Sequence, residues 1–159
     1  MHVSVSDIVA ERAERVAQRA NATPISPAAF WGTRAEVVSP CALGGVLTAE
    51  RASTLQGVRI ICGAANNILA AKHVEQVLQN AGITWIPDVL ASAGAVVRGI
   101  ARSVMKVDDP STMISRLGRI TTEVLEQAHA ERRLASEVIE TRVQARLSNA
   151  DVALECFAG

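Results

Sequence analysis

Three short runs rich in β-branched residues each end in a stretch of small or turn-forming residues. The runs lie at Glu36–Val38, Val58–Ile61 and Ile83–Ile86, and intervals of helix length separate them. Strands that alternate with helices form a parallel sheet with right-handed crossovers. The pattern therefore predicts an α/β fold with strands near 36–39, 58–62 and 83–86. A ligand crevice is expected where these strands end, because open parallel sheets bind ligands at their carboxyl ends.

The first 30 residues continue the same alternation. His2–Asp7 reads as a further strand near 3–6, and Ile8–Ala20 as an amphipathic helix with its apolar residues on one face. Pro24–Ile25 is expected to form a short edge strand, because proline cannot donate to a ladder. Ser26 followed by Pro27 predicts the start of a short helix. Two more helices are expected, at 48–55 and 71–80.

The last 50 residues change character and predict two long antiparallel helices. The first follows Asp109-Pro110, and the second runs from Ser136 to Leu147. The residues expected to face inward from the second helix are Val138, Ile139, Val143 and Leu147. We divide the chain into a partial Rossmann-like domain at 1–107, a helical pair at 108–150 and a tail without clear pattern at 151–159.

Three motifs follow the three central runs. They read Pro40-Cys41-Ala42-Leu43-Gly44, then Gly63-Ala64-Ala65-Asn66-Asn67, then Pro87-Asp88 continuing to Ser92-Ala93-Gly94. Together they resemble the cofactor-binding domain of the glutamate/leucine/phenylalanine/valine dehydrogenases, where the chain reads close to P-C-A-L-G, G-A-A-N-N and P-D-x-x-x-N-A-G-G. The resemblance covers nearly the whole chain, but only the last part of a full-length family member.

This resemblance implies a truncated Rossmann-like parallel sheet and NAD(P)-linked oxidative deamination of a hydrophobic L-amino acid. The residues that it places against the cofactor are Asp7, Cys41, Ala42, Ala65 and Asn66. The residues that it places against the substrate are Asn67 and Ser92. Ser92 departs from the family pattern, which has asparagine there, and Ala95 stands where the family has a second glycine. Both departures weaken a family-like grip on the nicotinamide or the substrate.

Two parts of the family machinery have no counterpart in these 159 residues. No two of the ten glycines are separated by one residue, so the chain contains no Gly-x-Gly-x-x-Gly to cradle a pyrophosphate. Neither Lys72 nor Lys106 lies in a glycine-rich context like that of the family's catalytic lysine. We therefore expect the chain to begin just before the second Rossmann strand, with its catalytic residues unassigned and its redox activity absent in isolation.

Several of these residues have structural alternatives. Either asparagine of Ala65-Asn66-Asn67 is a pocket residue or a cap of the next helix. Asp7 is equally suited to hold ribose hydroxyls or to cap the helix from Ile8. Asp88 is expected to cap the helix that follows it. Cys41 is read as a small thiol lining the crevice, Cys62 as a core residue and Lys72 as part of a solvated helix face.

Composition narrows the function classes further. Sixteen basic residues balance sixteen acidic ones, so no global charge favours nucleic acid or an anionic membrane. The three histidines lie far apart and no Cys/His cluster suggests a metal. Three cysteines without a paired spacing, and no secretory signal, indicate reduced thiols in the cytoplasm.

Two readings of the function stay open. The chain is the cofactor-binding part of an amino-acid dehydrogenase, or it is a stand-alone protein that keeps the scaffold without the redox chemistry. The second reading predicts a non-redox enzyme or an interaction protein that binds an amino- or imino-acid-like ligand. In either case an unpaired sheet edge favours a homo-oligomer or a complementing subunit.

Overall fold

The computed structural model describes residues 2–155 and shows an α/β fold with all strand pairs parallel. Each expected strand and helix is present; most have shorter bounds, whereas β2 is shifted by one residue and α8 extends beyond the predicted end at Leu147. The elements are β1 Ser4–Val5, α1 Ala10–Ala20, β2 Thr23–Pro24, α2 Pro27–Phe30, β3 Val37–Val38, α3 Ala49–Thr54, β4 Ile60–Ile61, α4 His73–Asn80, β5 Thr84–Trp85, α5 Asp88–Ala91, α6 Ala93–Ile100, α7 Ser111–Glu131 and α8 Ala135–Glu155.

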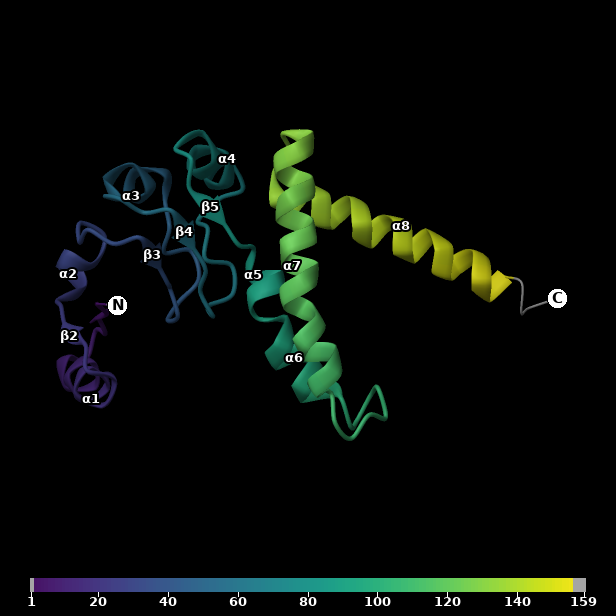
Figure 1. Cartoon of the computed structure of the whole chain (residues 1–159), viewed down its shortest axis with the longest axis horizontal. Helices are drawn as coiled ribbons and strands as arrows, with labels where there is room; N and C mark the ends of the chain where they lie inside the picture. The colour runs from purple at the N-terminus through teal and green to yellow at the C-terminus, as the bar shows by residue number, and fades with distance from the viewer. Residues whose placement is uncertain (1, 156–159) are drawn as a thin grey trace.

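The strands form two separate sheets. β1 pairs with β2, and β3, β4 and β5 follow one another in a second sheet. In Figure 1 the β1–β2 pair lies at the left with α1, and the three-stranded sheet lies between it and the long helices. Within the described residues, each outer strand, namely β1, β2, β3 and β5, carries one edge without a partner strand. The predicted parallel arrangement is confirmed, while the sheet is divided into two.

One face of the three-stranded sheet holds the main core. Val38, Ile61 and Trp85 alternate with their neighbours along β3, β4 and β5, and they are buried beneath α3 and α4. The register also aligns the residues on the opposite face, Val37, Ile60 and Thr84. These three are exposed, so helices cover only one face of the sheet.

Local hydrogen bonds from short polar side chains explain where α2 and α3 begin and how the chain turns into α7. The Ser26 hydroxyl accepts from Ala29 N at 3.3 Å, with Pro27 at the first helical position, as expected. The Thr48 hydroxyl accepts from Arg51 N at 3.1 Å and starts α3. Asp109 Oδ1 accepts from Ser111 N at 3.0 Å, which turns the chain into α7 through Pro110.

The expected antiparallel helical pair forms only in part. The first turns of α8 pack on the end of α7 through Val124, Ala128, Ala135 and Val138. The chain then leaves α7, and α8 runs outward in Figure 1. Val143 is 47% exposed and Leu147 54% exposed, so the prediction that they face inward is wrong. Their helical spacing is correct, but no described element covers that part of α8, which continues to Glu155.

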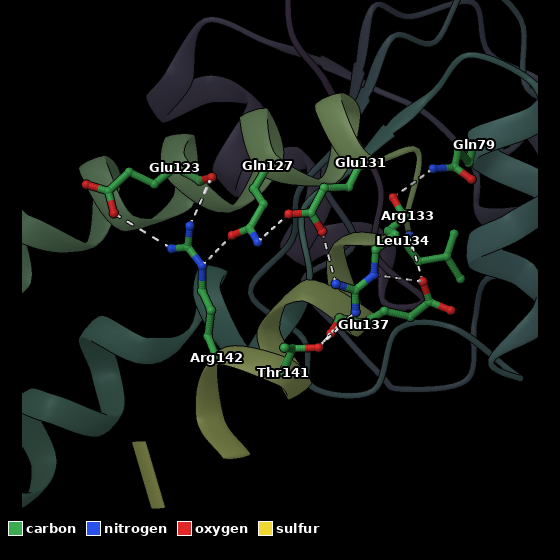
Figure 2. Close-up of polar contacts among 9 residues, drawn as sticks. All are labelled: Gln79, Glu123, Gln127, Glu131, Arg133, Leu134, Glu137, Thr141 and Arg142. Carbon is green, nitrogen blue, oxygen red and sulfur yellow. Dashed lines mark hydrogen bonds and ion pairs between the residues drawn. The ribbon is translucent and has the colours of Figure 1, made fainter. Parts of the chain in front are cut away.

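Polar side chains join the two long helices where they meet (Figure 2). Arg142 donates from Nε to Gln127 Oε1 at 2.8 Å and from a guanidinium nitrogen to Glu123 O at 3.3 Å. Gln79 of α4 reaches the same turn and donates to Arg133 O at 3.0 Å. The bond from Gln79 attaches the helical pair to α4. Within residues 2–155, no helix has the combination of length and apolar composition needed to span a membrane.

Candidate functional site

Three loops leave the carboxyl ends of the three-stranded sheet and meet there. The first loop is Ser39–Gly45 after β3, the second is Gly63–Asn67 after β4, and the third is Pro87–Ser92 after β5 and includes α5. Neighbouring parallel strands end at the same edge, so the sheet itself brings these loops together. The first two sequence motifs map onto the first two loops, and the third motif begins in the third loop and continues into α6.

Backbone bonds join the first loop to the second. Ala65 N donates to Pro40 O at 3.2 Å, and Gly45 N donates to Asn67 O at 2.7 Å. Glycine makes this approach possible, because a Cβ on Gly63 would lie 2.0 Å from Pro40 O. A Cβ on Gly44 would lie 2.6 Å from the backbone oxygen of Asn66. Both positions therefore need glycine so that the first and second loops can pack against each other.

The second loop is joined to the third by Asp88. Asn67 has a left-handed backbone with φ of 52°, and its N–H donates to Asp88 Oδ2 at 2.6 Å. The expectation that Asp88 caps the following helix is wrong, since α5 has no side-chain cap. Its carboxylate instead accepts a charge-assisted bond from a loop 21 residues earlier in the chain. Sequence reasoning missed this role, because nothing local to Asp88 marks its distant partner.

Neither asparagine caps a helix. α4 begins only at His73, with Lys72 as its capping residue, well after the second loop. Asn66 is exposed, and its Oδ1 lies 3.4 Å from Ser92 Oγ. Its amide nitrogen donates to no residue that the structure describes. An amide with a free N–H₂ at a crevice can donate to a carbonyl or carboxylate of a ligand.

The Ser92 hydroxyl is less available to a ligand than the Asn66 amide. Its hydroxyl donates to Asp88 O at 2.6 Å, a short bond within the third loop. The hydroxyl that replaces the family's asparagine is therefore used to close the turn of α5. What it offers a ligand is the remaining lone-pair capacity of one oxygen.

The other residues expected in the crevice divide into two groups. Cys41 and Ala42 are exposed on the first loop, and Cys41 Sγ lies 3.3 Å from Ser39 Oγ. Ala65 is only 6% exposed and belongs to the main core, so its side chain packs inward. That Ala65 contacts the cofactor stays a prediction.

Cys62 lies where β4 enters the second loop and is half-buried rather than a full core residue. Burial raises the pKa of its thiol, and the neighbouring Cys41 raises that pKa further. Cys62 is therefore a neutral thiol at physiological pH. Lys72 is exposed at the start of α4, as expected of a solvated face. Within the described part of the chain, no three His, Cys, Asp or Glu side chains are grouped as metal ligands would be.

Asp7 does not join the three loops. It follows β1, in the other sheet, and its Oδ1 accepts from Val9 N at 2.8 Å. This bond orders the turn that precedes α1, but Asp7 does not cap the helix, because its N-cap residue is Val9 and no side chain caps it. A role for Asp7 in holding ribose stays a prediction.

Comparisons with known proteins agree with this geometry. The family model described as Glutamate/Leucine/Phenylalanine/Valine dehydrogenase matches residues 3–153. An L-tryptophan dehydrogenase of Nostoc punctiforme is 36% identical over 94 residues, which make up 58% of this chain and 26% of that protein. A leucine dehydrogenase of Geobacillus stearothermophilus is 26% identical over 151 residues, covering 89% of this chain and 41% of that protein.

A solved structure matches the fold across most of the chain. The crystal structure of L-tryptophan dehydrogenase from Nostoc punctiforme superposes with a TM-score of 0.82 and 26% sequence identity. The match covers 94% of this chain and 46% of that one. This chain thus spans less than half the length of the relatives that it matches.

Proposed function

This chain belongs to the glutamate/leucine/phenylalanine/valine dehydrogenase family, and on that premise we propose that it is the coenzyme-binding part of an NAD(P)-dependent amino-acid dehydrogenase. The observation that carries the proposal is the meeting of the three motif loops at the carboxyl edge of the three-stranded sheet. Its substrate would be a hydrophobic L-amino acid, because relatives are named for tryptophan and leucine. The pocket that selects the side chain stays unassigned.

The residues on these three loops suit the nicotinamide half of the coenzyme. Ala42 and Cys41 leave a small, exposed wall on which a flat ring can lie. The Asn66 amide stands ready to pair with a carboxamide, with Ser92 beside it. Bound NAD(P)⁺ would accept a hydride from the α-carbon of the amino acid. In this scheme the Asn67 backbone and the Asp88 carboxylate hold the second and third loops together, because they are hydrogen-bonded to each other.

These residues contain no glycine-rich loop that would bind the pyrophosphate of the coenzyme. The sequence contains no Gly-x-Gly-x-x-Gly, so several backbone donors to the phosphates are lacking. Three lost charge-assisted bonds cost on the order of 5 kcal/mol, which moves a micromolar dissociation constant into the millimolar range. We expect the 159-residue chain by itself to bind NAD weakly and to oxidise no amino acid.

Calorimetric titration with NADH tests this proposal. The expected dissociation constant is about millimolar, and Asn66→Ala should weaken binding by roughly 1–3 kcal/mol through the lost amide. The melting temperature should barely change, because Asn66 is exposed and lies outside every helix. Gln144→Ala is the matched control, since Gln144 is an exposed amide on α8. Equal affinity of the two variants for NADH would contradict the proposal, and low-micromolar binding would contradict the cost assigned to the missing glycine motif.

One observation favours the second reading, a protein that keeps the scaffold without redox chemistry. The Ser92 hydroxyl is committed to Asp88 O, so the family's amide at this position has no equivalent here. On that reading the crevice binds an amino- or imino-acid-like ligand without a dinucleotide. Binding of a hydrophobic amino acid to the chain with no response to NADH would favour it.

The divided sheet supports an oligomer or a complementing subunit. Within the described residues the outer strands β1, β2, β3 and β5 each present an unpaired edge, and such edges accept further strands. A cytoplasmic location is consistent with the free thiols Cys41 and Cys62. Sedimentation of the purified chain as a monomer at all concentrations would remove self-association from the proposal.

A further inference from the structure

Two cysteines, Cys41 and Cys62, lie where β3 and β4 pass into the first two loops. The ladder between these strands extends to Cys62, whose N–H donates to Val38 O at 3.1 Å. Val38 pairs with Ile61 in register. The residues that follow this pair, Ser39 and Cys62, therefore stand opposite one another. Neighbouring strands lie about 4.8 Å apart and side chains alternate between faces, so both point to the exposed face of the sheet.

The first loop turns the Cys41 side chain back toward this position. Cys41 Sγ lies 3.3 Å from Ser39 Oγ. Pro40, which precedes Cys41, packs against Gly63, because a Cβ on Gly63 would lie 2.8 Å from the Pro40 carbonyl carbon. Gly63 directly follows Cys62 in the chain. The two cysteines thus flank the contact that joins the first two loops.

The electrostatics of the two thiols agree with this proximity. Burial raises the pKa of the Cys62 thiol, and Cys41 raises that pKa further. A like charge has this effect only at short range. Both cysteines are free thiols, and Cys41 is exposed whereas Cys62 is half-buried. A reagent in solution therefore reaches Cys41 first, with Cys62 placed behind it as a second thiol.

We propose that Cys41 and Cys62 form a reversible disulfide that closes the candidate site under oxidising conditions. The inference rests on the proposed function, because it takes Cys41 as part of the wall for the nicotinamide ring. A disulfide holds its two sulfurs about 2.05 Å apart and its Cβ atoms about 3.5–4.5 Å apart. To reach that geometry, Cys41 Sγ must leave Ser39 Oγ, and the backbone of Ala42 must move with it. The ring thereby loses the surface on which it would lie.

The oxidant in this scheme is a small disulfide such as oxidised glutathione. The Cys41 thiolate attacks one of its sulfurs, the S–S bond of the small disulfide breaks, and one thiolate leaves. The Cys62 thiolate then attacks Cys41 Sγ, breaks the mixed disulfide and releases the second thiolate. Two electrons pass from the cysteines to the small disulfide, and the two cysteine protons end on the released thiols. A thiol reductant reverses both steps.

Mass spectrometry of the full chain tests the linkage. After treatment with oxidised glutathione, the chain should lose the mass of two hydrogen atoms and yield a joined peptide containing Cys41 and Cys62. Cys62→Ser should instead trap glutathione on Cys41, and Cys41→Ser should form no internal disulfide. Cys156→Ser is the matched control, because it keeps both cysteines and should behave like the unaltered chain. No internal linkage, a linkage between two copies, or one that needs Cys156 would overturn the inference.

Titration with nicotinamide mononucleotide tests the closure of the site. The oxidised chain should bind the mononucleotide about tenfold more weakly than the reduced chain, and dithiothreitol should restore binding. Amide signals of residues 40–45 should shift on oxidation, because the first loop moves. Equal binding by the oxidised and reduced forms would overturn the inference.

The inference and the proposed function can fail separately. An internal disulfide with shifted signals at residues 40–45, and no binding of the mononucleotide to the reduced chain, would support the disulfide and overturn the proposed function. Binding of the mononucleotide to the reduced chain, with no internal disulfide after oxidation, would do the reverse.

Discussion

The three-stranded unit and the long helical pair hold their shapes by different means. In the described residues the sheet unit buries a core of eleven side chains, including Leu47, Ile61 and Leu78. The helical pair buries four, two of them alanine. It relies instead on the arginine and glutamate contacts of Figure 2. The sheet unit is thus the better-packed part of the molecule, and it carries the candidate site.

Because of this difference, the geometry of the site and the placement of the long helices depend on different interactions. Apolar burial is worth roughly 25 cal/mol per Å², whereas exposed ion pairs contribute about 0–1 kcal/mol each. The three loops are fixed by backbone bonds over a buried core, so their geometry should survive changes in α8. The helical pair should be the part that shifts when solution conditions change.

The largest expected effect is a cavity in the sheet unit. Leu78 of α4 is fully buried, and Leu78→Ala should destabilise the protein by about 2–5 kcal/mol. Val138→Ala, in the smaller core, should cost less and leave the amide spectra of the three loops unchanged. Chemical denaturation measures the loss of stability in both variants, and amide spectra show whether the three loops move. Loop signals that move with Val138→Ala would show that the two regions are not independent.

A smaller effect is expected from adding one methyl group between the loops. Gly63→Ala places its Cβ 2.0 Å from Pro40 O, so the first two loops must separate. Overpacking of this kind costs about 1–3 kcal/mol, and here it also opens the crevice. Gly99→Ala is the control, because nothing lies within 4 Å of its Cβ position on α6. A crystal structure of Gly63→Ala with unmoved loops would disprove the stated role of this glycine.

The bond between the second and third loops comes next. Asp88→Ala leaves the Asn67 N–H without its acceptor and should cost about 1–2 kcal/mol, since the site is partly exposed. Asp88→Asn keeps a carbonyl oxygen in place and should retain much of that stability. Thermal melts of the two variants decide the point. Equal loss in both would mean that charge, rather than an acceptor, holds the loops together.

The smallest expected effect is a change in the pKa of Glu131, in the helical pair. A hydrogen bond from Gln127 lowers the pKa of Glu131, and Arg133 lowers it further. A lowered folded-state pKa stabilises the fold above the unfolded value, and this contribution is lost as pH falls through the folded value. Gln127→Ala should raise the pKa of Glu131 toward its usual range. Carbon NMR titration of the Glu131 carboxyl measures this, and an unchanged pKa would contradict it.

Much of the sheet unit follows from local sequence, but the helical pair does not. Runs such as Val58–Ile61 predict their strands, and Ser26-Pro27 predicts a helix start, because strand propensity and capping act over a few residues. Val143 and Leu147 keep a helical period, yet only a neighbouring element decides whether that face is covered. For the same reason the Asp88–Asn67 bond could not be predicted, since its partners meet only after β4 and β5 have paired.

The central claim is that three loops on the carboxyl ends of β3, β4 and β5 form one coenzyme site. The most direct measurement is a ¹H–¹⁵N titration of the chain with nicotinamide mononucleotide, which lacks the adenosine half. The account predicts shifts confined to residues 40–45, 63–67 and 88–92, and loss of those shifts in Asn66→Ala. Saturating shifts located on α7 and α8, or none at the three loops, would contradict it.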